Sequence, residues 1–125
     1  METKYLKLND IDAYKIAFHL SNYVWDVVIN WEPFAKRTIG EQFVGAADSI
    51  SANIAEGFGR YFKKDKIKFY RYSAGSVKEC FDWNEKSKMR SLLKQKEYDF
   101  IFGELQKLPE AMNRLIKFTN LKLKD

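Results

Sequence analysis

The clearest structural signal in this sequence is the segment Gln42-Phe-Val-Gly-Ala-Ala-Asp48-Ser-Ile-Ser-Ala-Asn53-Ile-Ala-Glu56-Gly57-Phe-Gly59-Arg60. Apolar residues recur in it at intervals of three or four, which is the spacing of one face of an α-helix. They are Phe43, Ala47, Ile50, Ile54 and Phe58. Gly57 and Gly59 predict the end of the helix, because glycine readily adopts the left-handed conformation that closes a helix.

The start of this helix and the extent of the one before it follow from capping residues. Thr38-Ile-Gly-Glu41 matches a capping box, so we expect the helix to begin at Thr38. An earlier helix is predicted from Asn9 or Asp10, either of which can cap it, to about Trp31. Its apolar residues occupy more than one side, which is more than a single core stripe requires.

Two further helices complete a set of four. The third is capped by Asp65 and ends in the polar stretch 88–93. The fourth carries an apolar stripe over residues 98–115 and contains Pro109, which should kink it without necessarily ending it. Because short connections between long helices favour antiparallel neighbours, we expect an all-α, antiparallel up-and-down four-helix bundle.

The composition is that of a globular protein in one domain, residues 1–125. Hydrophobic residues make up 46% of the chain and charged residues 31%, which suits neither a disordered chain nor a membrane protein. No apolar run reaches the ~18 residues of a membrane span. The single cysteine, Cys80, and an N-terminus without a signal-like apolar core predict a cytoplasmic location.

Aromatic residues are unusually frequent, at 16% of the chain. A four-helix core of this size has difficulty enclosing all of them. We therefore expect some of them to lie in a subunit interface, where aromatic rings bury large areas at low entropic cost. The alternative is that they fill a crowded monomeric core.

The groups that catalysis usually needs are scarce. His19 is the only histidine, and no Glu-x-x-His pattern of a di-metal bundle occurs. The sequence Gly57-Phe-Gly59 follows a helix, whereas phosphate-binding glycine loops follow a strand. We expect a protein that is not an enzyme and that holds no cofactor or metal.

Residues 53–79 contain polar side chains beside the apolar stripe, and these have two possible interpretations. If Asn53 and Glu56 are buried, they need hydrogen-bond partners, for which Arg60, Ser76 and free helix-end carbonyls are candidates. The structural interpretation is a hydrogen-bonded lock between helix ends, and the functional one is a ligand pocket.

The run from Gln42 to Glu79 resembles the four-helix-bundle proteins encoded in intervening sequences of bacterial 23S ribosomal RNA genes. The resemblance rests on Ser-Ile-x-x-Asn-Ile-Ala-Glu-Gly at residues 49–57 and Gly-Ser-x-x-Glu at residues 75–79. It implies a bundle that assembles into a cyclic homopentamer. It also implies a relationship to the accessory proteins of diversity-generating retroelements, basic rings that associate with a reverse transcriptase and with nucleic acid.

Eight residues match the pattern of that family and look fold-defining. They are Asn53, Glu56, Gly57, Gly59, Arg60, Gly75, Ser76 and Glu79. The chain departs from the pattern over residues 80–89, where Trp83, Asn84 and Glu85 stand in a segment that is rich in leucine and alanine in the family. A partner shared with the family therefore does not follow from the resemblance.

The positive charge is concentrated in the second half of the chain. Residues 60–125 hold 17 basic and nine acidic side chains, and a basic run spans the turn between the second and third helices. It consists of Arg60, Lys63, Lys64, Lys66, Lys68 and Arg71. Aromatic residues such as Tyr61 and Phe62 are interleaved with these cations, so phosphates and unpaired bases are suitable ligands. We predict RNA or DNA binding by an oligomer, with a protein-interaction scaffold as the alternative.

Overall fold

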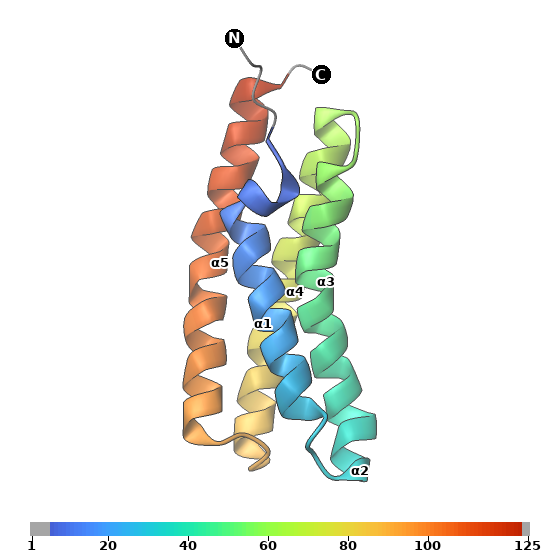
Figure 1. Ribbon diagram of the computed structural model, residues 1–125, viewed down its shortest axis with the longest axis vertical. Coiled ribbons are helices and arrows are strands. Elements are labelled where there is room, and N and C mark those ends of the chain that lie inside the picture. Colours follow the sequence, from blue (N-terminus) through green and yellow to red (C-terminus); the bar gives the residue numbers. More distant parts are fainter. Residues whose placement is uncertain (1–5, 124–125) are drawn as a thin grey trace.

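The computed structural model describes residues 6–123, in which four long helices stand side by side along the long axis of the molecule (Figure 1). They are α1 (Asp12–Val28), α3 (Glu41–Phe58), α4 (Lys63–Met89) and α5 (Gln95–Lys122). No strand forms in this described range. Helix α3 packs on α1 and α4, and α5 packs on the same two helices, so the four helices surround one core.

The core is apolar and draws on all four helices. Its largest fully buried aliphatic and aromatic side chains are Leu20, Val24, Phe43, Ile50, Ile54, Tyr70, Ile101, Leu105, Leu108 and Met112. The stripe predicted for α3 is confirmed from Phe43 to Ile54, whereas Phe58 is only half-buried. Within residues 6–123, each helix is too short or too polar to span a bilayer.

The inward face of α4 is more polar than its apolar residues alone predict. Ser73 and Asn84 are fully buried on it, whereas the apolar residues Ile67 and Phe81 are only half-buried. The Ser73 hydroxyl donates to the backbone carbonyl of Ile50 over 2.7 Å. This bond ties α4 to α3 and satisfies a polar group that would otherwise be costly to bury.

The second helical stretch begins earlier than the predicted Thr38. Short helix α2 (Pro33–Ala35) leads into a wide π-helical turn, η2 (Lys36–Gly40), and then into α3 without a break. The Glu32 carboxylate caps it by accepting from the amides of Phe34 and Ala35. Thr38 instead donates to the carbonyl of Phe34 over 2.8 Å. A proline at the first helical position, after an acidic capping residue, also signals the start of a helix. The prediction relied on the capping box at Thr38 instead.

Two other residues predicted as helix caps, Asp10 and Asp65, also occupy different positions from those predicted. The Asp10 carboxylate accepts the amide of Lys7 and closes a short 3-10 turn, η1 (Leu8–Asp10), while α1 starts after it at Asp12. Helix α4 starts at Lys63, two positions before Asp65, which lies in the first turn. A carboxylate there still stabilises the helix, because the first turn carries partial positive charge.

Helix α5 runs through Pro109 without a break, as predicted. Proline lacks the amide that would bond to the carbonyl four residues earlier. Pro109 itself is exposed, whereas Leu105, whose carbonyl loses this bond, is buried. The end predicted for the preceding helix, in the stretch 88–93, is also confirmed, since α4 ends at Met89.

Candidate nucleic-acid interface

The six predicted cations do not share one surface, because a helix turns successive residues to different sides. Lys64, Lys68 and Arg71 are exposed on α4. Lys63 and Lys66 are half-buried at the start of the same helix. The structure therefore divides these five residues into an outward group, Lys64, Lys68 and Arg71, and an inward group, Lys63 and Lys66. Arg60 is exposed in the loop before α4, where contacts within the fold hold it.

The inward group stabilises the corner between α3 and α4. The Lys66 ammonium donates to the carbonyl of Phe58 over 2.7 Å and lies 5.4 Å from the centre of the Phe58 ring. Burial lowers the pKa of Lys66. Arg60 pairs with Glu56 at 2.8 Å and stacks over Phe69 at 4.5 Å. These cations have partners within the fold and are poorly placed to bind a ligand.

The outward group extends further along α4 than the predicted basic run. Lys78 is exposed, and together with Lys64, Lys68 and Arg71 it follows helical spacings of four, three and seven residues. We call these four residues the basic face. In the described range none of them forms an ion pair, and Gly75 lies in the gap between Arg71 and Lys78 with open space around its α-carbon.

The basic face has a defined length and end. At 1.5 Å per residue, Lys64 and Lys78 are about 21 Å apart along the helix axis. Beyond Lys78 the exposed side of α4 becomes acidic, with Glu79, Asp82 and Glu85. Asp82 there pairs with Lys86 at 2.6 Å. The basic face thus occupies the N-terminal half of α4.

The residues predicted to form a hydrogen-bonded lock are distributed differently. The Asn53 amide donates to Ser49 and Glu79 accepts from Trp83, so both side chains bond within their own helices. Two members join the helices: Arg60, which pairs with Glu56 and stacks on Phe69 of α4, and Gly57. A β-carbon at Gly57 would lie 2.8 Å from the ring of Tyr70, so only glycine lets the two helices approach this closely. Gly59 and Gly75 have no side chain, and the Ser76 hydroxyl makes no hydrogen bond within residues 6–123.

A second unusual surface lies on α1. Phe18, Trp25 and Ile29 are exposed on one side of this helix, and Trp25 is 53% exposed. We call these three residues the apolar face. The excess of aromatic residues noted in the sequence is therefore visible on the surface, since aromatic side chains of this size are usually buried.

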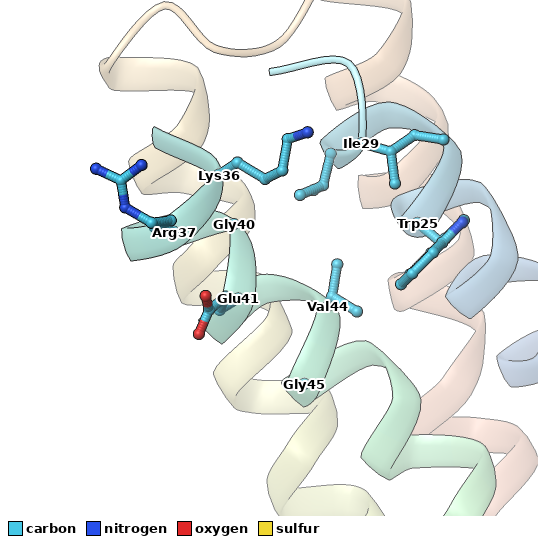
Figure 2. A pocket seen from close by; sticks show the side chains of 9 residues that line it. Trp25, Ile29, Lys36, Arg37, Gly40, Glu41, Val44 and Gly45 are labelled. Carbon is cyan, nitrogen blue, oxygen red and sulfur yellow. The ribbon is translucent and has the colours of Figure 1, made fainter. Parts of the chain in front are cut away.

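A pocket of about 360 Å³ opens beside the apolar face, between the end of α1 and the π-helical turn. Figure 2 shows Val44 pointing into the space between the helices and Lys36 extending from η2 toward α1, whereas Arg37 and Glu41 point outward. Gly40 and Gly45 also line it. Its lining is mainly apolar, with a cation at the mouth.

Groups that support catalysis are not assembled in the described range. His19 is exposed on α1, and its nearest ring neighbour is Phe18. Cys80 is buried, and burial raises the pKa of its thiol well above the usual range, so the thiol stays protonated. Among residues 6–123, no three side chains of the types that bind metal ions come together.

The fold and surfaces define a class: an all-α protein with four long helices, one unpaired basic face and one exposed apolar face. Residues 9–114 match the 23S rRNA-intervening sequence proteins, and the chain belongs to that family. This match confirms the resemblance that residues 42–79 carry.

A solved structure shares the fold. It is the 1.70 Å crystal structure of a protein with unknown function from the S23 ribosomal protein family of Bacteroides thetaiotaomicron VPI-5482. The two structures align with a TM-score of 0.73 at 15% identity, over 83% of this chain and 97% of that chain. At this identity the similarity supports the fold alone. No curated protein is significantly similar to this chain.

Proposed function

We propose that the chain is a non-enzymatic oligomer that binds RNA or DNA through the basic face of α4. The observation that carries the proposal is four exposed cations on one side of a helix, none paired with a carboxylate in the described range. Lys86 and Lys107, by contrast, have acidic partners on their own helices. Unpaired cations in a row suit a phosphate backbone, which binds them with release of counterions.

The dimensions of the basic face suit a nucleic-acid strand. Its length of about 21 Å corresponds to roughly six nucleotides at 3.4 Å each along a duplex strand. Gly75, near the middle, presents bare backbone and lets a phosphate approach closely. The contacts would be to backbone rather than to base edges, so we expect binding with little sequence preference.

We further propose that the helices run in antiparallel up-and-down order. Helix α4 has 27 residues and is thus about 40 Å long. The links 59–62 and 90–94 each span at most about 18 Å when fully extended. Each link therefore joins neighbouring helix ends, which supports a chain that reverses direction at both of these turns.

We also propose that the apolar face makes the protein a cyclic homo-oligomer, with five subunits as the family resemblance implies. A complementary surface lies on the other side of α1. There Tyr23 stacks on Phe100 of α5 with ring centres 4.3 Å apart, and Asp26 and Asp99 are exposed beside the pair. An aromatic surface with acidic groups complements a pocket with Lys36 at its mouth.

Such a contact joins two different surfaces of the same chain, so repetition closes a ring. Each copy would then present its own basic face. Several faces acting together increase affinity by the effective concentration of each site near the next. Oligomerisation would therefore strengthen nucleic-acid binding.

The absence of catalysis is part of the same proposal. The exposed His19 has no acidic or basic side chain hydrogen-bonded to it in the described range, and the Cys80 thiol is inaccessible. A nucleophile or general base needs a partner within hydrogen-bond reach. These observations support a binding protein rather than an enzyme.

Fluorescence anisotropy with mixed-sequence RNA and DNA tests the nucleic-acid proposal. Gly75→Glu places a negative charge within the basic face without steric conflict, and Gly103→Glu is the matched control on α5, where space is equally open. We expect Gly75→Glu to weaken binding at least tenfold and Gly103→Glu to have little effect. Equal losses in both variants, or no binding at about 50 mM salt, where phosphate contacts are strong, would contradict the proposal.

Sedimentation velocity at micromolar concentration tests the oligomer. A ring gives a single species several times the mass of the chain, 14.8 kDa. A monomer would instead favour the alternative, a scaffold whose apolar face docks a different protein, such as the reverse transcriptase that the resemblance implies. A pull-down whose partners survive nuclease treatment would support that alternative.

A further inference from the structure

Two aromatic side chains stand in solvent where the basic face begins. Tyr61 is 87% exposed and Phe62 is 57% exposed, in the loop between α3 and α4. Their rings meet edge to face with centres 5.0 Å apart. Neither ring contributes to the buried core. Exposed aromatic rings beside unpaired cations are the combination that single-stranded nucleic acid binds.

A hollow of about 630 Å³ connects Phe62 with the basic face, and Lys63 and Asp65 also line it. It lies between the start of α4 and the last turns of α5. Phe62 and Ile67 give it apolar walls, and Asn120 of α5 is exposed at its edge. Lys64 lines the hollow and is also the first residue of the basic face, so the two surfaces are continuous.

We infer that this hollow binds an unpaired nucleobase, at the point where a strand held along α4 runs past the end of the helix. The inference rests on the proposed nucleic-acid binding and names its ligand as a duplex with a single-stranded end. Phe62 and Tyr61 offer the base a stacking surface. Lys64 meets the adjoining phosphate, and the Asn120 amide can donate to and accept from a base edge.

Asn120 is suited to this role because its amide makes no hydrogen bond within the described range. An amide carries two donors and one acceptor, so it can pair with two adjacent atoms of a base. Stacking tolerates every base, whereas the amide discriminates among them. The site is therefore expected to accept any unpaired base and to prefer some of them.

The experiment measures anisotropy with a blunt duplex and with the same duplex carrying a short unpaired overhang at its 3′ or 5′ end, as RNA and as DNA. We expect one overhang to bind about fivefold to 100-fold more tightly than the blunt duplex, which is the effect of stacking one base. Phe62→Ala should abolish this preference, and Phe62→Trp should retain it. Asn120→Ala should change only the ranking of overhang sequences.

Lys78→Gln is the matched control, because it lies at the far end of the basic face. It should weaken both probes equally and leave the preference intact. Equal binding of both probes by the unaltered protein overturns the inference while the proposed function stands. Failure to bind either probe overturns both. An overhang preference that Phe62→Ala leaves unchanged, or a change in sedimentation of that variant, overturns the inference, since the aromatic pair then serves another contact.

Discussion

The basic face of α4 and the apolar face of α1 are both exposed rows on long helices, yet they call for different partners. Lysine and arginine lie in water at little cost, whereas exposed rings such as Trp25 gain free energy when another surface covers them. The two helices lie across the bundle from each other, because each packs mainly on α3 and α5. Contact between copies through α1 thus leaves α4 free for a ligand.

The largest expected effect is on the basic face. The double variant Lys68→Glu/Arg71→Glu should weaken nucleic-acid binding about 100-fold or more at low salt, because two phosphate contacts become repulsive. Anisotropy at constant salt measures it. Lys96→Glu/Lys117→Glu changes the net charge equally on the exposed side of α5 and should have a small effect. Similar losses in both variants would show that overall charge, rather than this face, governs binding.

The next effect separates the two faces. Trp25→Asp should dissociate the oligomer, because it places a charge in an apolar contact, and should reduce affinity for a long nucleic acid about 100-fold through loss of avidity. Sedimentation velocity and anisotropy on the same sample report the two changes. His19→Asp, also exposed on α1, is the control. If Trp25→Asp leaves the sedimentation coefficient unchanged, the apolar face is not the contact between copies.

A substitution in α3, which carries neither the basic face nor the apolar face, should alter the stability of the fold but not binding or assembly. Gly57→Ala pushes a β-carbon to within 2.8 Å of the Tyr70 ring and should lower the free energy of unfolding by about 1–3 kcal/mol. Urea denaturation measures it. Gly45→Ala, which has no atom within 4 Å of its added carbon, should instead raise stability by about 0.5–1 kcal/mol. Equal effects of the two changes would contradict the close approach of α3 and α4.

The smallest effect compares an outward lysine with an inward one. Lys78→Gln should reduce the slope of log affinity against log salt by about one and leave stability unchanged. Lys66→Gln should leave the slope unchanged and lower stability, since Lys66 bonds to the carbonyl of Phe58. Anisotropy at several salt concentrations, together with thermal melting, measures both. If Lys66→Gln reduced the salt slope and Lys78→Gln lowered stability, Lys66 would be the phosphate contact and Lys78 the structural residue.

The four helices were predictable because their apolar periodicity is strong, but several starts were not. Thr38 illustrates the reason: its hydroxyl can cap a helix or bond back to the preceding turn, and here it bonds to Phe34. The polar core of α4 was also missed. Asn84 is fully buried, and its carbonyl oxygen and the Ser87 hydroxyl have no partner in the described range. Periodicity of apolar residues alone cannot place such positions.

The sequence predicted which segment supplies the cations of the candidate site, but not which of them share one surface. The basic run was read as consecutive residues, whereas the helix exposes Lys64, Lys68 and Arg71 and turns Lys66 inward. Extending the helical spacing by one step past Gly75 would have found Lys78. The engagement of Arg60 with Glu56 and Phe69 depends on how α3 meets α4, which no local pattern encodes.

The salt dependence of nucleic-acid binding is the most direct test of binding through the basic face. It compares the unaltered protein with a variant in which Lys64, Lys68, Arg71 and Lys78 are all changed to glutamine. We expect a steep fall in affinity with salt for the protein, and a slope smaller by about four in the variant if each cation contacts one phosphate. Equal slopes for the two proteins would contradict it.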